Sequence, residues 1–260
     1  MEAELIGEGR RAEILAWHNG TVLKLYRDPA EVDAATEEAR ATSAAHAAGA
    51  PAPRCFGTAA FGERTGVILE RLSGPVLVDE ILNGDATKAV VDLATLLATI
   101  HRCRSTESRS VLPGLARRIG SALPPEKSAR IVERMRELGD APTLLHTDLH
   151  VLNAVRNSRG RAIAIDWDTL FHGPPLYDVA RSLYLLVEAD AGDAIEPTDG
   201  LQSFRRQGGA IFLETYGASA AIDGAELAAW RLPVLAARLT EEIAEERDYL
   251  HREIHISLGD

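Results

Sequence analysis

The sequence predicts an α+β protein of two lobes, in which a small antiparallel β-sheet with one helix precedes a larger, mostly helical part. Strand-like runs separated by glycine-containing turns fill the first part, and after Gly74 apolar residues recur at helical spacing. The chain of 260 residues is long enough for two lobes that share a cleft. We therefore expect residues 1–74 to form an N-terminal lobe and residues 75–260 a C-terminal lobe.

The first lobe is expected to contain a β-hairpin near its start. Residues 12–17 and 21–26 are strand-like and flank a turn with Asn19-Gly20, and Asn-Gly is a strong hairpin signal. Lys24 stands in the middle of the second strand among apolar neighbours. It is therefore either an edge-strand lysine that faces water or a cation that contacts phosphates.

Two glycines precede this hairpin in the sequence, and a stretch that predicts a helix follows it. Gly7 and Gly9 precede the first strand, where glycines let backbone N–H groups approach a phosphate closely. After the hairpin, residues 31–48 are rich in alanine and glutamate and end at Gly49, which predicts a helix with a glycine stop. A further strand is expected over residues 65–72, before a Ser-Gly-Pro break.

Helical patterns dominate the second lobe. Helices are predicted over residues 87–103 and 126–135, and about three more after Asp178. Pro233 should kink or divide the last of them, because proline lacks an N–H and clashes with the preceding turn. The tail that follows, residues 241–249, is strongly acidic, and such charge runs are usually solvated helix faces.

The stretch of residues 144–180 carries the densest polar motifs. Two short strand-like runs, 154–156 and 161–165, are joined by a polar segment with a glycine, which predicts a second β-hairpin. Because a hairpin brings its two ends together, Asn153 before it and Asp166 after it should lie close to each other. This hairpin is expected to organise the functional site.

The residues around this hairpin suit phosphoryl transfer. That reaction needs a carboxylate to orient the attacking hydroxyl and oxygen ligands to hold Mg²⁺ against nucleotide phosphates. His146, Asp148 and Asn153 have the H-x-D-x-x-x-x-N spacing of a kinase catalytic loop. A second aspartate follows in Ile165-Asp166-Trp167-Asp168, where protein kinases have D-F-G.

With Gly173-Pro174-Pro175-Leu176-Tyr177-Asp178 behind it, this stretch resembles the aminoglycoside phosphotransferase and choline kinase family. Members of that family look like protein kinases but phosphorylate small molecules. The resemblance implies a protein-kinase-like bilobal fold, ATP or GTP as co-substrate, and Mg²⁺. It implies that Asp148 is the catalytic base and that Asn153 and Asp166 hold the metal.

The resemblance also implies roles in the first lobe. Lys24 would contact the α- and β-phosphates and would be held by a glutamate of the helix, which is Glu38 by its position, with Glu37 as the alternative. Backbone groups at about Glu70 to Leu72 would bind the nucleotide base.

Supporting roles are expected for several neighbours of the catalytic loop. His146 and His150 should position the loop by hydrogen bonds, and Asp178 should brace it from the start of a helix. Asp168 would complete the metal shell or cap the next turn. The chain departs from the resembled family at Thr147, where the family usually has glycine, and a side chain there restricts the backbone or reaches towards the acceptor.

The net charge, the cysteines and the apolar runs of the sequence limit which classes of partner and which location are expected. The net charge of −11 argues against binding to nucleic acid or an anionic membrane and favours a cationic partner. Cys55 and Cys103 are far apart and are expected to be buried thiols of a reduced, cytoplasmic protein. No apolar run reaches the ~18 residues of a spanning helix. The expected partners are therefore a nucleotide and a small-molecule acceptor.

The acceptor is predicted to be a small, cationic hydroxyl compound, most simply an aminoglycoside or related antibiotic. In aminoglycoside phosphotransferases, acidic residues of C-terminal helices line the acceptor pocket, and the acidic tail at 241–249 is in the corresponding part of this chain. Choline-like amino alcohols, homoserine and sugars are the alternatives among the family's substrates.

Two functions from other classes compete with the kinase interpretation. His146, Asp148 and His150 alternate, so an extended segment would present them on one face as ligands of a metal hydrolase. That interpretation leaves Lys24 and the second aspartate without a role. A non-catalytic nucleotide-binding protein of the same shape is the second alternative, although such proteins typically lose the base or the metal ligands.

Overall fold

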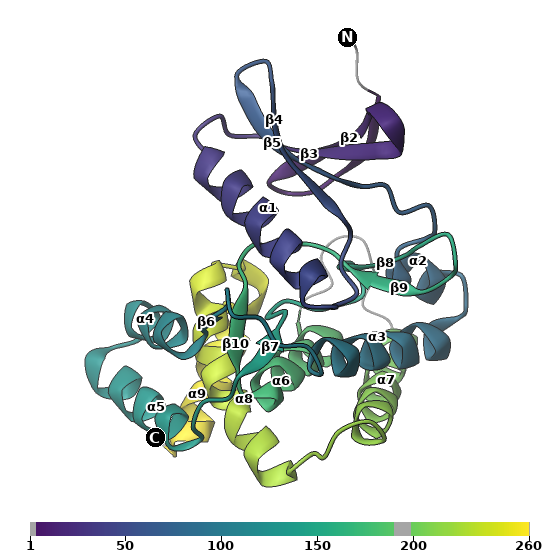
Figure 1. The fold of residues 1–260 in the computed structure, drawn as a ribbon. Coiled ribbons are helices and arrows are strands. Elements are labelled where there is room, and N and C mark those ends of the chain that lie inside the picture. The colour runs from purple at the N-terminus through teal and green to yellow at the C-terminus, as the bar shows by residue number, and fades with distance from the viewer. Residues whose placement is uncertain (1–3, 190–198, 260) are drawn as a thin grey trace.

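The structure of the chain, a computed structural model, describes residues 4–189 and 199–259. A five-stranded antiparallel sheet with one helix against it forms one end of the molecule, and a mostly helical part forms the other (Figure 1). The strand order is β1-β2-β3-β5-β4. The elements of this end are β1 (Leu5–Glu8), β2 (Ala12–Trp17), β3 (Thr21–Tyr26), α1 (Val32–Ala47), β4 (Cys55–Phe61) and β5 (Arg64–Glu70).

The first predicted hairpin is confirmed as β2 and β3. Asn19 and Gly20 between them have φ values of 58° and 71°, the left-handed backbone that such a turn requires. Side chains of a strand alternate between its two faces. Leu23 and Leu25 of β3 are fully buried on one face, so Lys24 and its next-but-one neighbour Tyr26 lie on the face that α1 covers.

Helices with three short strand pairings make up the remainder of the described chain. Its helices are α2 (Leu77–Leu82), α3 (Ala86–Ile100), α4 (Leu112–Ala122), α5 (Pro125–Glu137), α6 (Pro175–Val187), α7 (Asp199–Gly217), α8 (Gly224–Arg238) and α9 (Ala244–Leu258). Its strands are β6 (Arg109–Ser110), β7 (Thr143–Leu145), β8 (Ala154–Arg156), β9 (Ala162–Ala164) and β10 (Phe171–Gly173).

The main core lies among these helices. Leu93 and Leu97 of α3, Phe212 of α7 and Trp230 and Leu235 of α8 are all fully buried in one cluster. Helical spacing in the sequence predicted α3 and α5 well, because their apolar faces are continuous. The structure adds α4 and β1, which the sequence analysis did not predict as elements, and Gly7 lies inside β1 rather than in a loop before the sheet.

Pro233 does not divide the helix that contains it. It lies within α8, buried between Leu232 and Val234, and the helix continues to Arg238. Of the two expected outcomes, a kink or a division, the division is wrong, because the buried residues on either side of Pro233 keep the segment helical; the kink stays a prediction. Within the described residues, no helix combines the length and the apolar character needed to span a bilayer.

The second predicted hairpin is confirmed as β8 and β9, and it lies beside α2, between the sheet and the larger helical part (Figure 1). Gly74, in the connection between β5 and α2, donates its N–H to the carbonyl of Arg156 on β8 at 2.9 Å. A Cβ at this glycine would lie 2.5 Å from the Cβ of Arg156, so only glycine allows this approach. The connection is therefore fixed to the hairpin that carries the site.

Candidate active site

Lys24 extends from β3 towards α1 and meets two carboxylates. Its Nζ lies 2.9 Å from Oε1 of Glu38 and also contacts the carboxylate of Asp166, which is 142 residues further along the chain. Burial disfavours the ammonium, but Glu38 and Asp166 outweigh that effect and raise the pKa of Lys24 above its ordinary value. Lys24 is therefore a buried, charged group, and an edge-strand lysine in water is excluded.

The structure distinguishes the two candidate glutamates of α1. Glu38 is 1% exposed, and its second oxygen accepts a hydrogen bond of 2.6 Å from the hydroxyl of Tyr26. Glu37 faces away from the lysine and binds Arg40 at 2.8 Å and Arg109 at 2.5 Å. Because successive residues of a helix point about 100° apart, only one of the two can face the sheet, and that one is Glu38.

The β8–β9 hairpin brings Asn153 and Asp166 to the same end, as expected. The N–H of Ile165 donates to the carbonyl of Asn153 at 3.0 Å, which closes the hairpin directly before Asp166. Asp166 has a φ of 69°, a conformation that costs a non-glycine residue energy and occurs mostly where function requires it. This backbone turn leads the Asp166 carboxylate to Lys24.

Three carboxylates gather beside Lys24. Oxygens of Glu38, Asp166 and Asp168 all lie within 4.8 Å of one another. Burial, together with the negative charge of Asp166, raises the pKa of Asp168 to about 6, and the guanidinium of Arg11 contacts Asp168 at 3.5 Å. Oxygen-only donors of this kind suit Mg²⁺, and a cation would relieve the repulsion between the carboxylates.

Asn153 is oriented by the catalytic loop. Its Nδ2 donates to the backbone carbonyl of Asp148 at 3.0 Å and approaches Oδ2 of the same residue at 3.5 Å. This leaves the amide oxygen Oδ1 of Asn153 as the atom available to a metal ion. The residues present therefore fit the magnesium site that the sequence predicted, with Asn153 and Asp166 as its expected ligands.

Asp148 is held in place by several groups. Its Oδ1 accepts a hydrogen bond of 2.9 Å from Nη2 of Arg181, and Oδ2 lies 3.7 Å from Nε2 of His150. The side chain is 45% exposed. Burial opposes ionisation, but His150 and Arg181 outweigh it and lower the pKa of Asp148 below its ordinary value. Asp148 is thus an ionised, oriented carboxylate that water and solutes can reach.

Asp178 braces the loop, as expected. Its fully buried carboxylate accepts hydrogen bonds from the N–H groups of His146 at 2.7 Å and of Thr147 at 2.8 Å, and it also contacts His101 at 3.2 Å. Thr147 has a φ of 69°, the left-handed region that favours glycine. The loop therefore has the backbone shape of a glycine at a position where this chain carries threonine.

The ring of His146 is buried and contacts a backbone carbonyl and a tryptophan ring. Its Nε2 lies 2.9 Å from the carbonyl of Ile165, and its ring packs against Trp167 with 4.6 Å between centroids. Burial lowers the pKa of His146, so the ring is neutral and Nε2 carries the proton. Its other nitrogen, Nδ1, accepts from the N–H of Asp148 at 3.4 Å, so both ring nitrogens are engaged by the backbone and neither is turned to a metal shared with Asp148 and His150. Among the described residues, the carboxylate cluster near Lys24 is the group arranged for a metal.

The remaining predicted nucleotide contacts lie around the sheet. Gly9 donates its N–H to the carbonyl of Ala12 at 2.8 Å and so makes the tight turn between β1 and β2. Glu70 ends β5, and Leu72 lies in the connection that follows. Their roles stay predictions.

Sequence reasoning missed Arg181 and Glu241. Arg181 on α6 binds both Asp148 and Glu241, and Glu241 also accepts from Arg118 at 2.9 Å. The available signal was an arginine directly after Val179-Ala180 on the face of α6 that carries Asp178. Two acids of the predicted acidic tail, Glu241 and Glu246, are therefore neutralised by arginines inside the protein.

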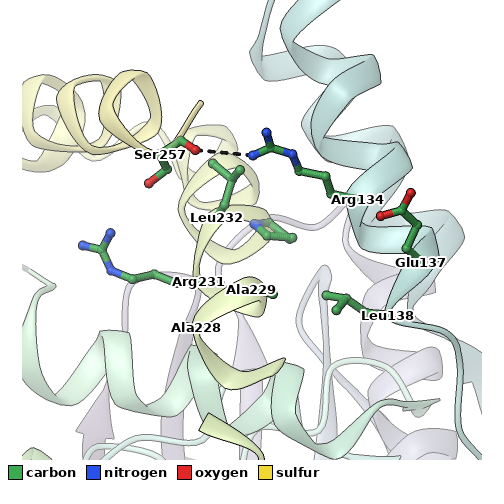
Figure 2. Close-up of a pocket in the computed structure, with 9 residues that line it drawn as sticks. Arg134, Glu137, Leu138, Ala228, Ala229, Arg231, Leu232 and Ser257 are labelled. Atoms are coloured by element: carbon green, nitrogen blue, oxygen red, sulfur yellow. Dashed lines mark hydrogen bonds between the residues drawn. The ribbon is translucent and has the colours of Figure 1, made fainter. Parts of the chain in front are cut away.

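A separate hollow lies among α5, α8 and α9, away from these residues (Figure 2). It has a volume of about 360 Å³ and includes Arg134, Leu232 and Ser257 in its wall. The guanidinium of Arg134 donates to the carbonyl of Ser257 at 3.3 Å (Figure 2). None of the predicted site residues lines it, so it is not the acceptor site expected from the sequence.

Comparison with known proteins identifies the family. The model of the phosphotransferase enzyme family matches residues 3–230. A search of curated proteins gives no match. Among solved structures, an aminoglycoside-3'-phosphotransferase of type VIII is 19% identical with a TM-score of 0.60, over 92% of this chain and 93% of that one.

Two further solved structures are similar over nearly the whole chain. Choline kinase LicA from Streptococcus pneumoniae is 13% identical with a TM-score of 0.65, over 100% of this chain and 93% of that one. Amicoumacin kinase hAmiN, solved with AMP-PNP, Ca²⁺ and Ami, is 13% identical with a TM-score of 0.66, over 98% and 88%. These similarities confirm the predicted protein-kinase-like fold.

Proposed function

Because the chain belongs to the phosphotransferase enzyme family, we propose that it transfers the γ-phosphoryl group of ATP or GTP to a hydroxyl of a small molecule. The observation that carries this proposal is the meeting of Lys24 with Glu38 and Asp166. A buried lysine held by a helix glutamate, beside an aspartate that follows the catalytic loop, is the arrangement that kinases use to bind nucleotide phosphates.

Lys24 binds the α- and β-phosphates in this proposal. Phosphates are stronger competitors for the ammonium than a lone carboxylate that is itself 38% exposed, so the nucleotide displaces Asp166 from Lys24 while buried Glu38 stays in place. Gly7 within β1 and Gly9 in the turn that follows lie at the edge of the same sheet, where the absence of side chains lets phosphates approach the backbone closely.

Asn153 would hold Mg²⁺ through its amide oxygen and Asp166 through its carboxylate, and Asp168, whose carboxylate lies in the same cluster as that of Asp166, would contribute a further oxygen. When bound, the ion neutralises charge on the phosphate oxygens. The guanidinium of Arg11 contacts the Asp168 carboxylate and offsets part of its negative charge. The support for the ion comes from the oxygen donor set and from the raised pKa of Asp168, which burial and, after it, the negative charge of Asp166 cause.

Asp148 orients the acceptor hydroxyl and accepts its proton late in the reaction. A carboxylate with a lowered pKa is a weak base for an alcohol, so its contribution is mainly alignment, and the proton moves only as the new P–O bond forms. Arg181 occupies Oδ1, which leaves Oδ2 as the oxygen for the hydroxyl.

For the acceptor we propose an aminoglycoside or related antibiotic, with a choline-like amino alcohol, homoserine or a sugar as alternatives. The support is the net charge of −11, which attracts cations at long range, and the acceptors named for the similar structures. The acidic tail gives less support than the sequence suggested, because Glu241 and Glu246 are paired with arginines.

A direct test is a screen of the purified protein with ATP or GTP and Mg²⁺ against streptomycin, choline, homoserine and glucose. We expect acceptor-dependent ADP or GDP formation and a product heavier by one phosphoryl group in mass spectrometry. Nucleotide binding without transfer to any acceptor would favour a non-catalytic protein, and zinc-dependent hydrolysis without nucleotide would favour the hydrolase.

A further inference from the structure

Arg181 lies inside α6 as a buried charge with two partners. Its side chain is 7% exposed, and its Nη2 donates to Asp148 at 2.9 Å and to Glu241 at 2.8 Å. A buried guanidinium is costly unless each charge near it is paired. Asp148 comes from the loop before β8, and Glu241 comes from the turn after α8. Arg181 therefore joins two segments that are far apart in the sequence.

The position of Arg181 on α6 gives it a second link to the loop. Asp178, one turn earlier on the same helix, holds the backbone N–H groups of His146 and Thr147. Side chains three residues apart on a helix lie on the same face. One face of α6 thus fixes the backbone of the loop through Asp178 and the carboxylate of Asp148 through Arg181.

Glu241 is fully engaged by arginines. It accepts from Arg118 at 2.9 Å and from Arg181 at 2.8 Å, and its other oxygen binds Arg238. A carboxylate shared by three guanidinium groups has no remaining charge to offer an acceptor amine.

We infer that Arg181 is a positioning residue for Asp148, and that Glu241 is the counter-charge that fixes Arg181 rather than a ligand of the acceptor. This inference rests on the proposed function. Nη2 of Arg181 donates to Oδ1 of Asp148 and to Glu241, so it holds Oδ1 towards α6, while Oδ2 lies on the side of His150 and Asn153.

The kinetic test compares Arg181→Met, Arg181→Lys and Glu241→Gln with the wild type. Misdirecting Asp148 should lower kcat of Arg181→Met about 100-fold, while KM for the nucleotide and the acceptor changes by less than about threefold. Arg181→Lys keeps the charge and should recover part of kcat. Glu241→Gln should lower kcat and leave KM of a cationic acceptor unchanged, whereas an acceptor ligand would raise that KM.

Glu246→Gln is the matched control. Glu246 is buried, belongs to the same acidic tail and binds Arg238 at 2.6 Å and the hydroxyl of Tyr184 at 2.8 Å, whereas Arg181 binds Glu241. It should lower the melting temperature and leave kcat close to that of the wild type. An equal loss of kcat in Glu246→Gln and Glu241→Gln, or an Arg181→Met enzyme within about threefold of wild-type kcat, would overturn the inference.

A second readout does not depend on activity. The Nη–H signals of a restrained guanidinium are resolved in ¹H–¹⁵N spectra, and those of Arg181 are assigned by their loss in Arg181→Lys. We expect them to shift in both Asp148→Asn and Glu241→Gln. If no acceptor is phosphorylated, the proposed function fails, and these spectra alone test the inference. Arg181 Nη–H signals whose chemical shifts do not change in Asp148→Asn would contradict it.

Discussion

Lys24 Nζ and Glu38 Oε1 are 2.9 Å apart, and this ion pair joins the middle of β3 to the buried face of α1. The pair is formed between an ammonium that is 16% exposed and a carboxylate that is 1% exposed, so it is only weakly screened by salt. In the proposed function, Lys24 keeps Glu38 as its partner while nucleotide phosphates replace its other partner, Asp166.

The first prediction compares two neighbouring glutamates. Glu38→Gln should raise KM for the nucleotide and lower kcat, together about 10- to 100-fold in kcat/KM, because a hydrogen bond to a charged group is lost. Glu37→Gln, which removes only contacts to Arg40 and Arg109 on the outer side of α1, should leave both constants unchanged. Steady-state kinetics with varied nucleotide measures this, and equal effects of the two variants would refute the assignment.

The second prediction concerns the proposed base. Asp148→Asn should leave nucleotide affinity nearly unchanged and lower the transfer rate about 10²- to 10⁴-fold, because a neutral amide aligns the hydroxyl less well than a carboxylate and does not accept its proton. Calorimetric titration with a non-hydrolysable nucleotide gives the affinity, and product formation gives the rate. A fully active variant would show that another group takes the proton.

The third prediction tests the strained loop backbone. Thr147→Gly should raise the free energy of unfolding by roughly 1 kcal/mol, because Thr147 has a φ of 69° and a Cβ is disfavoured there. Thr143→Gly in β7 is the control, since Thr143 is not among the residues with positive φ and glycine weakens a strand. Urea denaturation should therefore give opposite signs for the two variants, and a destabilised Thr147→Gly would argue against strain.

The fourth prediction follows from the buried, neutral ring of His146. Its folded-state pKa lies below the unfolded value of about 6.5, so the unfolded chain binds more protons, and stability falls as the pH drops below that value. The wild type should therefore lose more stability between pH 8 and pH 5 than His146→Gln does. Denaturation at both pH values measures the difference, and identical losses would mean that the ring titrates alike in both states.

Local patterns predicted much of the fold and of the site. Asn-Gly indicated the β2–β3 hairpin, the strand pattern placed Lys24 in the middle of β3, and the ends of the β8–β9 hairpin brought Asn153 and Asp166 together. Each of these depends on residues close in the chain, so sequence alone carries the information.

The ion pairs of the C-terminal part were not predictable in the same way. Arg181 meets Asp148 across 33 residues and Glu241 across 60, and although its place on the face of α6 that carries Asp178 was visible, the sequence does not identify such distant partners. The charge of the tail over residues 241–249 was visible, but its neutralisation by Arg238 and Arg181 depends on tertiary packing.

The most direct test of the account is a crystal structure with a non-hydrolysable ATP analogue and Mg²⁺. We expect Asn153 Oδ1 and the Asp166 carboxylate to bind the ion, and Lys24 to leave Asp166 for the α- and β-phosphates while keeping Glu38. A triphosphate bound elsewhere, with Lys24 still paired to Asp166, would contradict the central claim.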